Sequence, residues 1–538
     1  MNLKSEQTTQ KLRGGYYTPE MITDYLTSWI FEEKKEKISI FEPSAGDGAF
    51  LKSILKKDES HKVTAIEIDN TEYKKAKLST KKDERIKVLN TDFFKFYKES
   101  SEKYDAVIGN PPYIRYQFLE EKQRVIQSNI LEKNGMKANK LINSWVAFTV
   151  ATVERLKSNG KIAFVLPTDI LQVTYAQQLR EFLFKELSEI TLVTFQVSPF
   201  INIQQDVVLL MGVKKESYSE RSKFRVINLK TVDELKNFNK EKYYEVTSKK
   251  DKKWTKYLLG YNQTIAIDDL YNSHHCESLK NHGKVEVGIT TGKNELFCVI
   301  NDTIEKYDLA EFSRPLLGRS INSRGIHYGN DDLLENISNK KKAWLLDFNK
   351  EDKKDYPDGA LEYIRNIEKE GLNSGYKLSI RNEWYKVPSI WVPDAFMLRR
   401  IGLFPKFILN EISAISTDTF HRIKFTTDVD KYWIIFSLYS SISLLSIELA
   451  GRSFGGGALE ILPGDIDEVL VVKKKNNKLD SLGLFLQLDK MFRQNADHLE
   501  IVTFVDSIII EMGIFSESHM EKYQNIYFHL LKRRMKTS

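Results

Sequence analysis

The stretch Lys37-Ile-Ser-Ile-Phe-Glu-Pro-Ser-Ala-Gly-Asp-Gly-Ala-Phe50 decides the fold of the first part of the chain. Its apolar start, up to Pro43, is typical of a buried strand. Gly46 and Gly48 then let the backbone turn tightly and approach a ligand closely, and a helix is expected from Leu51 to Lys57. Strand, glycine turn and helix together indicate one unit of an α/β sheet that binds a nucleotide-like ligand.

Two further predicted strands each end in an acidic residue. The strand Lys62-Val-Thr-Ala-Ile-Glu-Ile-Asp69 carries Glu67, which lies 67 − 46 = 21 residues beyond Gly46. An acid about 20 residues past a glycine turn is placed to bind ribose hydroxyls. The strand Arg85-Ile-Lys-Val-Leu-Asn-Thr-Asp92 is followed by Phe93. An acid beside an aromatic ring suits adenine, although an ordinary helix N-cap followed by core aromatics, taken alone, explains the pair better.

A fourth predicted strand, Tyr104–Gly109, runs into Asn110-Pro-Pro-Tyr113. Each proline fixes φ and lacks an N–H, so the Pro111 carbonyl is presented in a fixed direction, and the Asn110 side-chain carbonyl can point to the same spot. Two acceptors aimed at one point suit an exocyclic amine, and the Tyr113 ring can cover the base that carries it. Taken alone, a cis-proline or a rigid loop explains this motif equally well. All four candidate sites, however, fall at the carboxyl ends of successive strands, where open α/β sheets bind ligands.

Composition sets the class of protein. The chain has 538 residues, 41% hydrophobic and 29% charged, which suggests a globular protein of two or three domains. No apolar run approaches the ~18 residues of a membrane span, and the N-terminus has no apolar signal region. Two cysteines, Cys276 and Cys298, argue against a disulfide framework and fit a reducing cytoplasm. The net charge of +7 is a modest bias toward polyanions.

The sequence pattern divides the chain into three parts. Residues 1–215 alternate strands and helices, and two late strands, 190–195 and 207–213, are expected to form a hairpin at the sheet edge. Residues 216–255 are charged, lose a clear period and are interpreted as a connecting segment. Residues 256–538 mix strands and helices, end in predicted helices and contain several glycine-rich stretches. The expected fold is therefore α/β, a Rossmann-like domain followed by a mixed α+β domain.

In these motifs the chain resembles the gamma-class (TaqI- and BseCI-like) adenine-N6 DNA methyltransferases. Phe41–Phe50 looks like the first cofactor motif of that class, and Asn110–Tyr113 looks like its catalytic motif. Tyr17-Thr-Pro19 matches the N-terminal motif that closes over the methionine end of S-adenosylmethionine. Gly288–Asn294 and Gly455–Gly457 are similar to motifs in the recognition domains of BseCI- and HincII-like enzymes, as is Arg381–Tyr385.

The resemblance implies a role for each part of the chain. It makes residues 1–215 the S-adenosylmethionine-binding catalytic domain and residues 256–538 the DNA target-recognition domain. The implied reaction transfers the methyl group of S-adenosylmethionine to N6 of a flipped-out adenine in duplex DNA, without a metal. The implied catalytic residues are Asn110, Pro111, Pro112 and Tyr113. The implied cofactor-binding residues are Tyr17, Thr18, Pro19, Glu42, Pro43, Ser44, Ala45, Gly46, Asp47, Gly48, Glu67, Ile68, Asp92, Phe93 and Asn110.

The resemblance also implies partners. Tyr16, Tyr113 and Phe200 are expected to form the pocket for the flipped base. Candidate DNA-binding residues are Arg115, Thr291, Lys293, Asn294, Arg319, Gly455 and Gly456. The expected protein is a monomer that acts on double-stranded DNA in the cytoplasm, associated with the nucleoid through that DNA. It has no membrane partner, and it works with or without a separate cognate restriction endonuclease.

Other functions remain open at this stage. The same Asn-Pro-Pro-Tyr motif serves methyltransferases that act on a glutamine amide of protein or on RNA, although those usually carry a domain before the cofactor motifs. A third alternative is an inactive methyltransferase-like DNA-binding protein. A combined restriction–modification enzyme is disfavoured, because no convincing paired Asp/Glu-x-Lys cluster follows. A metal site at His274-His275-Cys276 is disfavoured too, because adjacent ligands lack partners at metal-site spacing.

Overall fold

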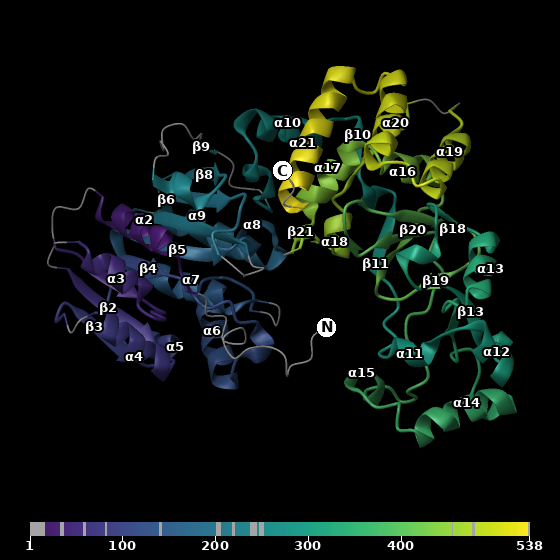
Figure 1. Cartoon of the computed structure of the whole chain (residues 1–538), viewed down its shortest axis with the longest axis horizontal. Coiled ribbons are helices and arrows are strands. Elements are labelled where there is room, and N and C mark those ends of the chain that lie inside the picture. The colour runs from purple at the N-terminus through teal and green to yellow at the C-terminus, as the bar shows by residue number, and fades with distance from the viewer. Residues whose placement is uncertain are drawn as a thin grey trace. The chain divides into compact units, whose positions relative to one another are not determined.

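The structure is a computed structural model of the chain, and it contains two compact units (Figure 1). Unit 1 is Met1–Thr264 and unit 2 is Ile265–Ser538. The described residues are 17–32, 37–57, 61–80, 83–138, 142–200, 206–217, 221–236, 245–246, 252–454, 456–475 and 479–535.

Unit 1 is built on a nine-stranded sheet with the order β3-β2-β1-β4-β5-β7-β6-β8-β9. Its strands are β1 (Ser39–Glu42), β2 (Lys62–Glu67), β3 (Ile86–Asn90), β4 (Tyr104–Gly109), β5 (Leu156–Pro167), β6 (Leu187–Phe195), β7 (Val207–Lys214), β8 (Lys223–Leu229) and β9 (Glu245–Val246). Its helices are α2 (Glu20–Phe31), α3 (Ala49–Leu55), α4 (Asn70–Ser79), α5 (Phe93–Glu99), α6 (Glu121–Lys133), α7 (Ser144–Glu154), α8 (Asp169–Gln172) and α9 (Gln177–Glu186), and α10 (Tyr261–Tyr271) leads into unit 2.

The strand order reverses between β1 and β4. β1 pairs in parallel with β2 on one side and with β4 on the other, so the chain builds the sheet outward in both directions from that point. The carboxyl ends of these strands diverge into helices on opposite faces, which leaves a crevice at the reversal. The glycine turn after β1 and the Asn-Pro-Pro-Tyr motif after β4 both border it.

Helices cover both faces of the sheet, and the strand residues alternate between two cores. On β4, Ala106 and Ile108 pack with α2, α3 and α4, whereas Val107 packs with α5, α6 and α7. On β5, Ala163 and Phe164 divide between the two cores in the same way. Because side chains of a strand point alternately to the two faces, the apolar runs seen in the sequence are buried on both sides, as parallel sheets require.

The hairpin of β6 and β7 is not at the sheet edge, so that prediction is wrong. β8 pairs in parallel with β6 along its whole length, and β9 pairs with β8. The sequence hides β8 because its apolar residues alternate with charged and polar ones and follow a charged loop. Both strands come from residues 216–255, and Trp254 and Tyr257, each 1% exposed, pack into the core of unit 1. Unit 1 therefore extends through the predicted connecting segment to Thr264.

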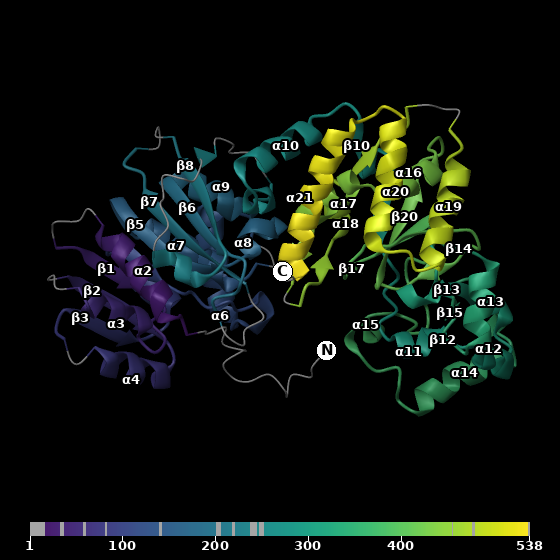
Figure 2. The ribbon, with the colours of Figure 1, turned by 45° about the horizontal axis from the view of Figure 1, so that its top comes forward.

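Unit 2 mixes small sheets with helices, as expected for an α+β domain (Figure 2). Its sheets have the orders β11-β20-β16-β18-β14, β12-β15-β13-β19, β17-β22-β21 and β10-β23. Its strands are β10 (Cys276–Ser278), β11 (Gly283–Val287), β12 (Cys298–Val299), β13 (Ser313–Leu317), β14 (His327–Tyr328), β15 (Trp344–Leu346), β16 (Ala395–Leu398), β17 (Arg400–Ile401), β18 (Phe407–Asn410), β19 (Ile415–Ser416), β20 (Phe420–Phe425), β21 (Arg452–Ser453), β22 (Leu459–Glu460) and β23 (Leu470–Val472). Its helices are α11 (Asn294–Phe297), α12 (Asn301–Tyr307), α13 (Asn330–Ser338), α14 (Asp358–Lys369), α15 (Tyr376–Ser379), α16 (Lys431–Ser437), α17 (Ser441–Ala450), α18 (Pro463–Ile466), α19 (Ser481–Arg493), α20 (His498–Glu511) and α21 (Glu517–Met535).

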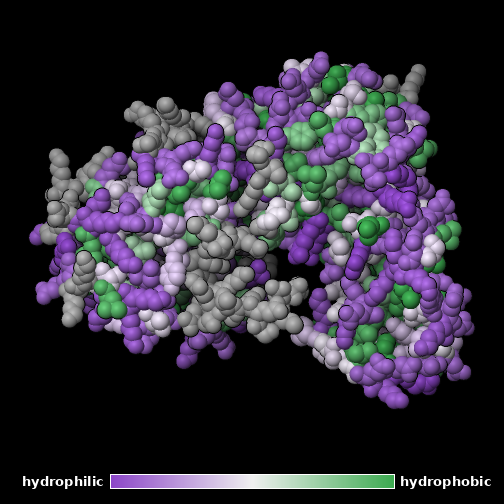
Figure 3. Space-filling model, in the orientation of Figure 1, coloured by the Kyte–Doolittle hydropathy of each residue, from purple (hydrophilic) through white to green (hydrophobic). Residues whose placement is uncertain are grey.

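The described surface is largely hydrophilic on the face seen in Figure 3. Among the described residues, no single helix is long and apolar enough to cross a membrane, and one bent pair, α16 and α17 at 73°, passes on length and composition. Every residue of α17 is buried, which also suits a core helix of a globular domain.

Candidate active site

A cavity of about 660 Å³ lies at the carboxyl ends of β1, β2, β3 and β4. Most residues predicted to bind a cofactor line it. These are Tyr17, Thr18, Glu42, Pro43, Ser44, Ala45, Gly46, Asp47, Glu67, Ile68, Asp92, Phe93 and Asn110, together with Pro112 of the predicted catalytic motif. Residues from four strand ends thus converge on one site, as the strand pattern predicts.

The turn after β1 is shaped by its glycines. Gly46 and Gly48 have φ values of +54° and +83°, in the left-handed region that disfavours side chains. A Cβ on Gly48 would lie 3.0 Å from Cα of Ala76 on α4, so this glycine allows α3 and α4 to pack closely. A Cβ on Gly46 would meet nothing within 4 Å, so its conformation alone calls for glycine.

The carboxylate of Glu67 ties the end of β2 to this turn. Its Oε2 accepts a hydrogen bond of 2.8 Å from the backbone N–H of Gly46, and its Oε1 accepts one of 2.8 Å from the N–H of Asp69. Burial raises the pKa of Glu67, and the two backbone hydrogen bonds oppose that rise. The side chain is thereby held in one orientation at the cavity wall.

Glu42, the last residue of β1, is fully buried and has no hydrogen-bond partner among the described residues for either carboxyl oxygen. Burial raises its pKa well above the ordinary value, and the carboxylates of Glu67 and Asp47 raise it further. An unsatisfied buried carboxyl costs free energy. Because Glu42 lines the cavity, a ligand that donates hydrogen bonds or carries positive charge would relieve that cost.

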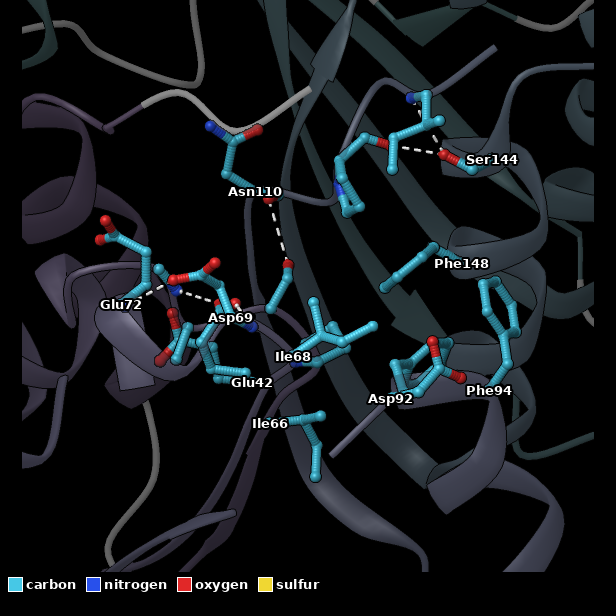
Figure 4. Close-up of a pocket in the computed structure, with 18 of the residues that line it drawn as sticks. Glu42, Ile66, Ile68, Asp69, Glu72, Asp92, Phe94, Asn110, Ser144 and Phe148 are labelled. Atoms are coloured by element: carbon cyan, nitrogen blue, oxygen red, sulfur yellow. Dashed lines mark hydrogen bonds between the residues drawn. The ribbon is translucent and has the colours of Figure 1, made fainter. Parts of the chain in front are cut away.

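The other end of the cavity is aromatic (Figure 4). Asp92 caps α5, accepting from the backbone N–H of Lys95 at 2.9 Å through Oδ1 and from Gln123 Nε2 at 2.9 Å through Oδ2. Phe93 stacks on Phe148 with ring centroids 4.5 Å apart. Asp92 is therefore both the helix N-cap that the sequence allows and a wall of the cavity.

Helix α6 closes this end, which the sequence did not reveal. Leu119, just before α6, and Gln123 and Gln127 line the cavity. The spacing of four residues places the two glutamines on one side of the helix. Gln127 is 6% exposed, and its Nε2 has no hydrogen-bond partner among the described residues. The i, i+4 spacing of Gln123 and Gln127 is the sequence signal that could have indicated this role, but an ordinary buried helix face has the same spacing.

Asn110 lies where β4 leaves the sheet. Its backbone carbonyl accepts a hydrogen bond of 3.1 Å from Ser44 Oγ (Figure 4), and its Nδ2 donates to Thr18 Oγ1 at 3.2 Å. Its Oδ1 accepts from the Tyr113 hydroxyl at 3.0 Å. Helix α2 begins at Glu20 with Pro19 as its N-cap, and the Thr18 side chain faces Asn110.

Five predicted residues do not line the cavity: Pro19, Gly48, Pro111, Tyr113 and Phe200. Pro111 is buried, and no described residue donates a hydrogen bond to its carbonyl oxygen. The Tyr113 hydroxyl also donates to the Val165 carbonyl at 3.1 Å, and Phe200 is 6% exposed within the core of unit 1. Tyr16, expected in the base pocket, lies outside the described residues. The described peptide bonds are all trans, so the Pro-Pro motif is not a cis-proline turn.

The cavity has a one-sided charge. Its lining includes six carboxyl residues, and none of the described lining residues is lysine or arginine. The six are Glu42, Asp47, Glu67, Asp69, Glu72 and Asp92. Figure 4 shows Glu42, Asp69 and Glu72 gathered on one side, opposite Phe94 and Phe148. The site therefore offers an acidic end and an aromatic end to a single ligand.

The predicted DNA-binding residues occupy several surfaces. Arg115 in unit 1 and Arg319 in unit 2 are exposed. In unit 2, Gly456 is exposed with φ of +87°, and Gly455 lies outside the described residues. The loop with Thr291, Lys293 and Asn294 is different, because its polar side chains form hydrogen bonds within unit 2. The Thr291 hydroxyl donates to Asn294 Oδ1, and Lys293 Nζ donates to the carbonyl of Leu372.

The fold and the cavity define a Rossmann-like S-adenosylmethionine-dependent methyltransferase domain joined to a mixed α+β domain. Residues 29–200 match the family described as Eco57I restriction-modification methylase, and residues 251–510 match the family described as type II methyltransferase M.Eco57I, C-terminal domain. In these two parts the chain is thus similar to the Eco57I-like type II restriction–modification methylases.

Relatives of known type agree with this family. The chain is 23% identical over 524 residues to the type II methyltransferase M.AccI of Acinetobacter calcoaceticus, covering 92% of this chain and 93% of that protein. It is 25% identical over 409 residues to the type II methyltransferase M.HincII of Haemophilus influenzae, covering 73% and 71%. The solved structure of MmeI, described as a type IIL restriction-modification enzyme in complex with DNA, covers 96% of this chain and 75% of that chain with a TM-score of 0.56 at 12% identity. That likeness concerns the fold alone.

Proposed function

We propose that this protein transfers the methyl group of S-adenosylmethionine to N6 of an adenine flipped out of duplex DNA. The observation that carries the proposal is the position of Asn110, whose carboxamide borders the same cavity as the glycine turn and Glu67. A planar amide acceptor beside a nucleoside-sized cavity suits methylation of an amine that has no acidic proton to remove.

The charge of the cavity supports a cationic nucleoside as its ligand. Two unit charges about 4 Å apart interact by roughly 4 kcal/mol at the effective dielectric near a protein surface, so the ionised carboxylates among the lining residues oppose the phosphates of a dinucleotide or nucleoside triphosphate. A ligand that carries a sulfonium and an ammonium group is instead attracted by these carboxylates. The carboxyl of Glu42 fits the same conclusion, because it has no hydrogen-bond partner among the described residues and a ligand in the cavity would supply one.

The two ends of the cavity fit the two ends of this cofactor. Glu67 would hold the ribose hydroxyls, and Glu42 and Thr18 would border the amino-acid end. Asp92 would accept from the purine amine, and Gln127 Nε2 would donate to a ring nitrogen. That acceptor–donor pair matches adenine, whose amine donates while its ring nitrogens accept. It mismatches a purine with an oxygen at position 6.

When bound, the cofactor supplies a methyl group already activated by its sulfonium. The chain's own task is to position the adenine amine. Asn110 Oδ1 and the carbonyl of Pro111 would accept hydrogen bonds from its two N–H groups, which favours a pyramidal nitrogen with its lone pair turned to the cavity. One of these N–H protons would be released to solvent after the methyl group is transferred. Positioned dipoles of this kind act without reorganisation at the moment of reaction. Tyr113 would release or share Asn110 Oδ1 as the base enters, because an amide oxygen has two lone pairs.

Duplex DNA is the substrate class that the family relationship favours. Extruding a base costs a few kcal/mol, and stacking on an aromatic ring such as Tyr113 offsets about 1–3 kcal/mol of that. We also propose that the protein acts as a monomer. A separate restriction endonuclease that cuts the same sequence is the partner that the restriction–modification relatives suggest, and the cytoplasm, at the nucleoid, is the expected place of action.

Methyl transfer to different acceptors tests the proposal. The purified protein would be incubated with tritiated S-adenosylmethionine and, separately, unmethylated bacterial DNA, RNA or a protein extract. We expect label in DNA as N6-methyladenine. Label in a glutamine amide or in RNA would favour the alternative acceptors, and no transfer with intact DNA binding would favour an inactive DNA-binding relative. The Asn110→Ala variant is the matched control.

A further inference from the structure

Two polar side chains of the loop Thr290–Asn294 donate hydrogen bonds within unit 2. Thr291 is 2% exposed, and its hydroxyl donates to Asn294 Oδ1. Lys293 Nζ donates a hydrogen bond of 2.8 Å to the carbonyl of Leu372. These two bonds tie the loop to the rest of unit 2, while Gly292 and Asn294 remain exposed.

What the loop supports is the segment 372–381, which contains α15. Gly292, with φ of +88°, lets the two pack closely, because a Cβ there would lie only 3.2 Å from Leu378 Cδ2. Leu378 is 2% exposed and belongs to the apolar core of this part of unit 2. Arg381 Nη2 donates to the Thr290 carbonyl at 3.1 Å. The segment is therefore attached to the loop by side chains at its beginning, middle and end.

The outward side of this segment is apolar and basic. Tyr376 is 80% exposed and Ile380 is 64% exposed, and their i, i+4 spacing places them on the same side. Lys377, between them in sequence, is exposed and forms no ion pair among the described residues. Figures 1 and 2 both show α15 beside α11, which starts at the end of the supporting loop.

This combination indicates an anionic partner with flat apolar surfaces. Neighbouring exposed apolar side chains mark interaction sites, and the supported backbone keeps the cost of ordering the segment on binding small. Residues 371–381 include two basic residues and no acidic one, and Lys293 adjoins them. Aromatic groups next to basic groups suit nucleic acid, because bases stack on rings while phosphates pair with cations.

We infer that Tyr376, Lys377 and Ile380 form a DNA-contact surface of unit 2, held in place by the Thr290–Asn294 loop. Lys377 contacts a phosphate, and Tyr376 and Ile380 pack against sugar or base edges of the duplex. The inference rests on the proposed function, since it takes duplex DNA as the substrate. It replaces Thr291 and Lys293 as DNA contacts with the residues that they support.

Single substitutions test each contact. Affinity for a fluorescein-labelled random-sequence DNA duplex would be measured by anisotropy at several salt concentrations, together with KM and kcat on sheared unmethylated bacterial DNA. Tyr376→Ala should weaken binding about tenfold and Tyr376→Phe should restore most of it. Lys377→Ala should reduce the slope of log affinity against log salt by about one. Both alanine variants should show a higher KM for DNA than the wild type and a nearly unchanged kcat.

Matched controls distinguish an effect of this surface from the effect of removing any exposed apolar side chain. Leu334→Ala removes an apolar side chain that is 62% exposed on α13, and it should leave DNA affinity unchanged, whereas Ile380→Ala lowers it. Gly292→Val keeps every proposed contact residue but disturbs the seat of α15, so it should weaken DNA binding as well. Circular dichroism and cofactor affinity would check that each variant stays folded.

The outcomes distinguish the two proposals. If the wild-type protein methylates DNA but the Tyr376, Lys377 and Ile380 variants bind the duplex as well as Leu334→Ala does, the contact surface is refuted and the proposed function stands. If the wild-type protein neither binds nor methylates duplex DNA, both are refuted. Loss of binding confined to the surface variants and Gly292→Val supports the inference.

Discussion

The hydroxyl of Tyr113 donates a hydrogen bond of 3.0 Å to Oδ1 of Asn110, and the same hydroxyl donates to the carbonyl of Val165 at 3.1 Å. The acceptor proposed for the adenine amine is therefore engaged by the ring proposed to stack on the base. Both residues belong to one rigid motif, so movement of Tyr113 and access to Asn110 Oδ1 are linked.

This link predicts different effects for two substitutions of Tyr113. Tyr113→Phe keeps the ring and frees Asn110 Oδ1, so methyl transfer should stay within a few fold of wild type. Tyr113→Ala removes the stacking surface and should lower kcat/KM by about tenfold or more, given roughly 1–3 kcal/mol per base–aromatic stack. Steady-state kinetics with unmethylated DNA would measure both. Equal losses in the two variants would show that the hydroxyl, not the ring, matters.

Asn110→Ala should lower methyl transfer by about 10²–10³-fold, the usual loss for one positioned dipole in a catalytic site. Cofactor affinity should change little, since the carboxamide lies at the rim of the cavity. Single-turnover transfer of labelled methyl groups and calorimetric titration of S-adenosylmethionine would separate the two effects. A variant that transfers methyl groups at the wild-type rate would exclude the proposed role of Asn110.

Gln127→Leu should act in opposite directions on stability and binding. The substitution removes a buried amide whose Nε2 has no partner among the described residues, so the ligand-free protein should melt at the same temperature or higher. The lost donor should weaken cofactor binding by about 1 kcal/mol, or roughly fivefold. Thermal unfolding with and without S-adenosylmethionine measures both. Lower stability with unchanged affinity would make Gln127 a packing residue only.

Cofactor affinity should increase as the pH rises through the raised pKa of Glu42. Below that pKa the buried carboxyl is neutral and does not attract a cation, whereas above it the charged form does. Glu42→Gln should bind S-adenosylmethionine more weakly at high pH and show a flatter pH dependence. Calorimetry over a pH series would compare the two proteins, and parallel curves would rule out Glu42 as the titrating group.

In unit 2, burial raises the pKa of Asp506 on α20 to about 7, although the backbone N–H of Ser441 donates to it at 2.9 Å. An unfolded aspartate titrates near pH 4, so between about pH 4 and about pH 7 the folded state binds more protons. Stability contributed by the neutral carboxyl is thus present at low pH and is lost as the pH rises. Asp506→Asn should be more stable than wild type above neutral pH and lose this dependence, as denaturant unfolding at several pH values would show.

Local patterns explain why much of unit 1 was predictable. The apolar runs before Glu67 and Asn110 are short, bounded by glycine or proline, and buried on both faces in a parallel sheet. The ends of such strands can therefore be predicted from the local sequence. Because parallel strands end on one edge, the polar residues after them could be placed together without knowledge of any long-range contact.

Other features depend on packing between distant segments. Asn110 and Thr18 are 92 residues apart, and Asp92 and Gln123 are 31 apart. No local period encodes which side chain of a helix meets which strand end. The strand β8 was missed for a related reason, because its alternating polar residues resemble a charged linker until a neighbouring strand supplies the pairing.

The sequence by itself determined the α/β order of unit 1, its glycine turn and the alignment of Glu67, Asp92 and Asn110 at one sheet edge. Only the tertiary structure decided that α6 closes the cavity with Gln127, that Glu42 has no hydrogen-bond partner among the described residues, and that Thr291 is buried while Tyr376 faces solvent. The physical reason is the separation along the chain over which each effect acts. Backbone propensity and strand alternation act over a few residues, whereas burial, charge environment and exposure are set by segments that meet only after the chain has folded.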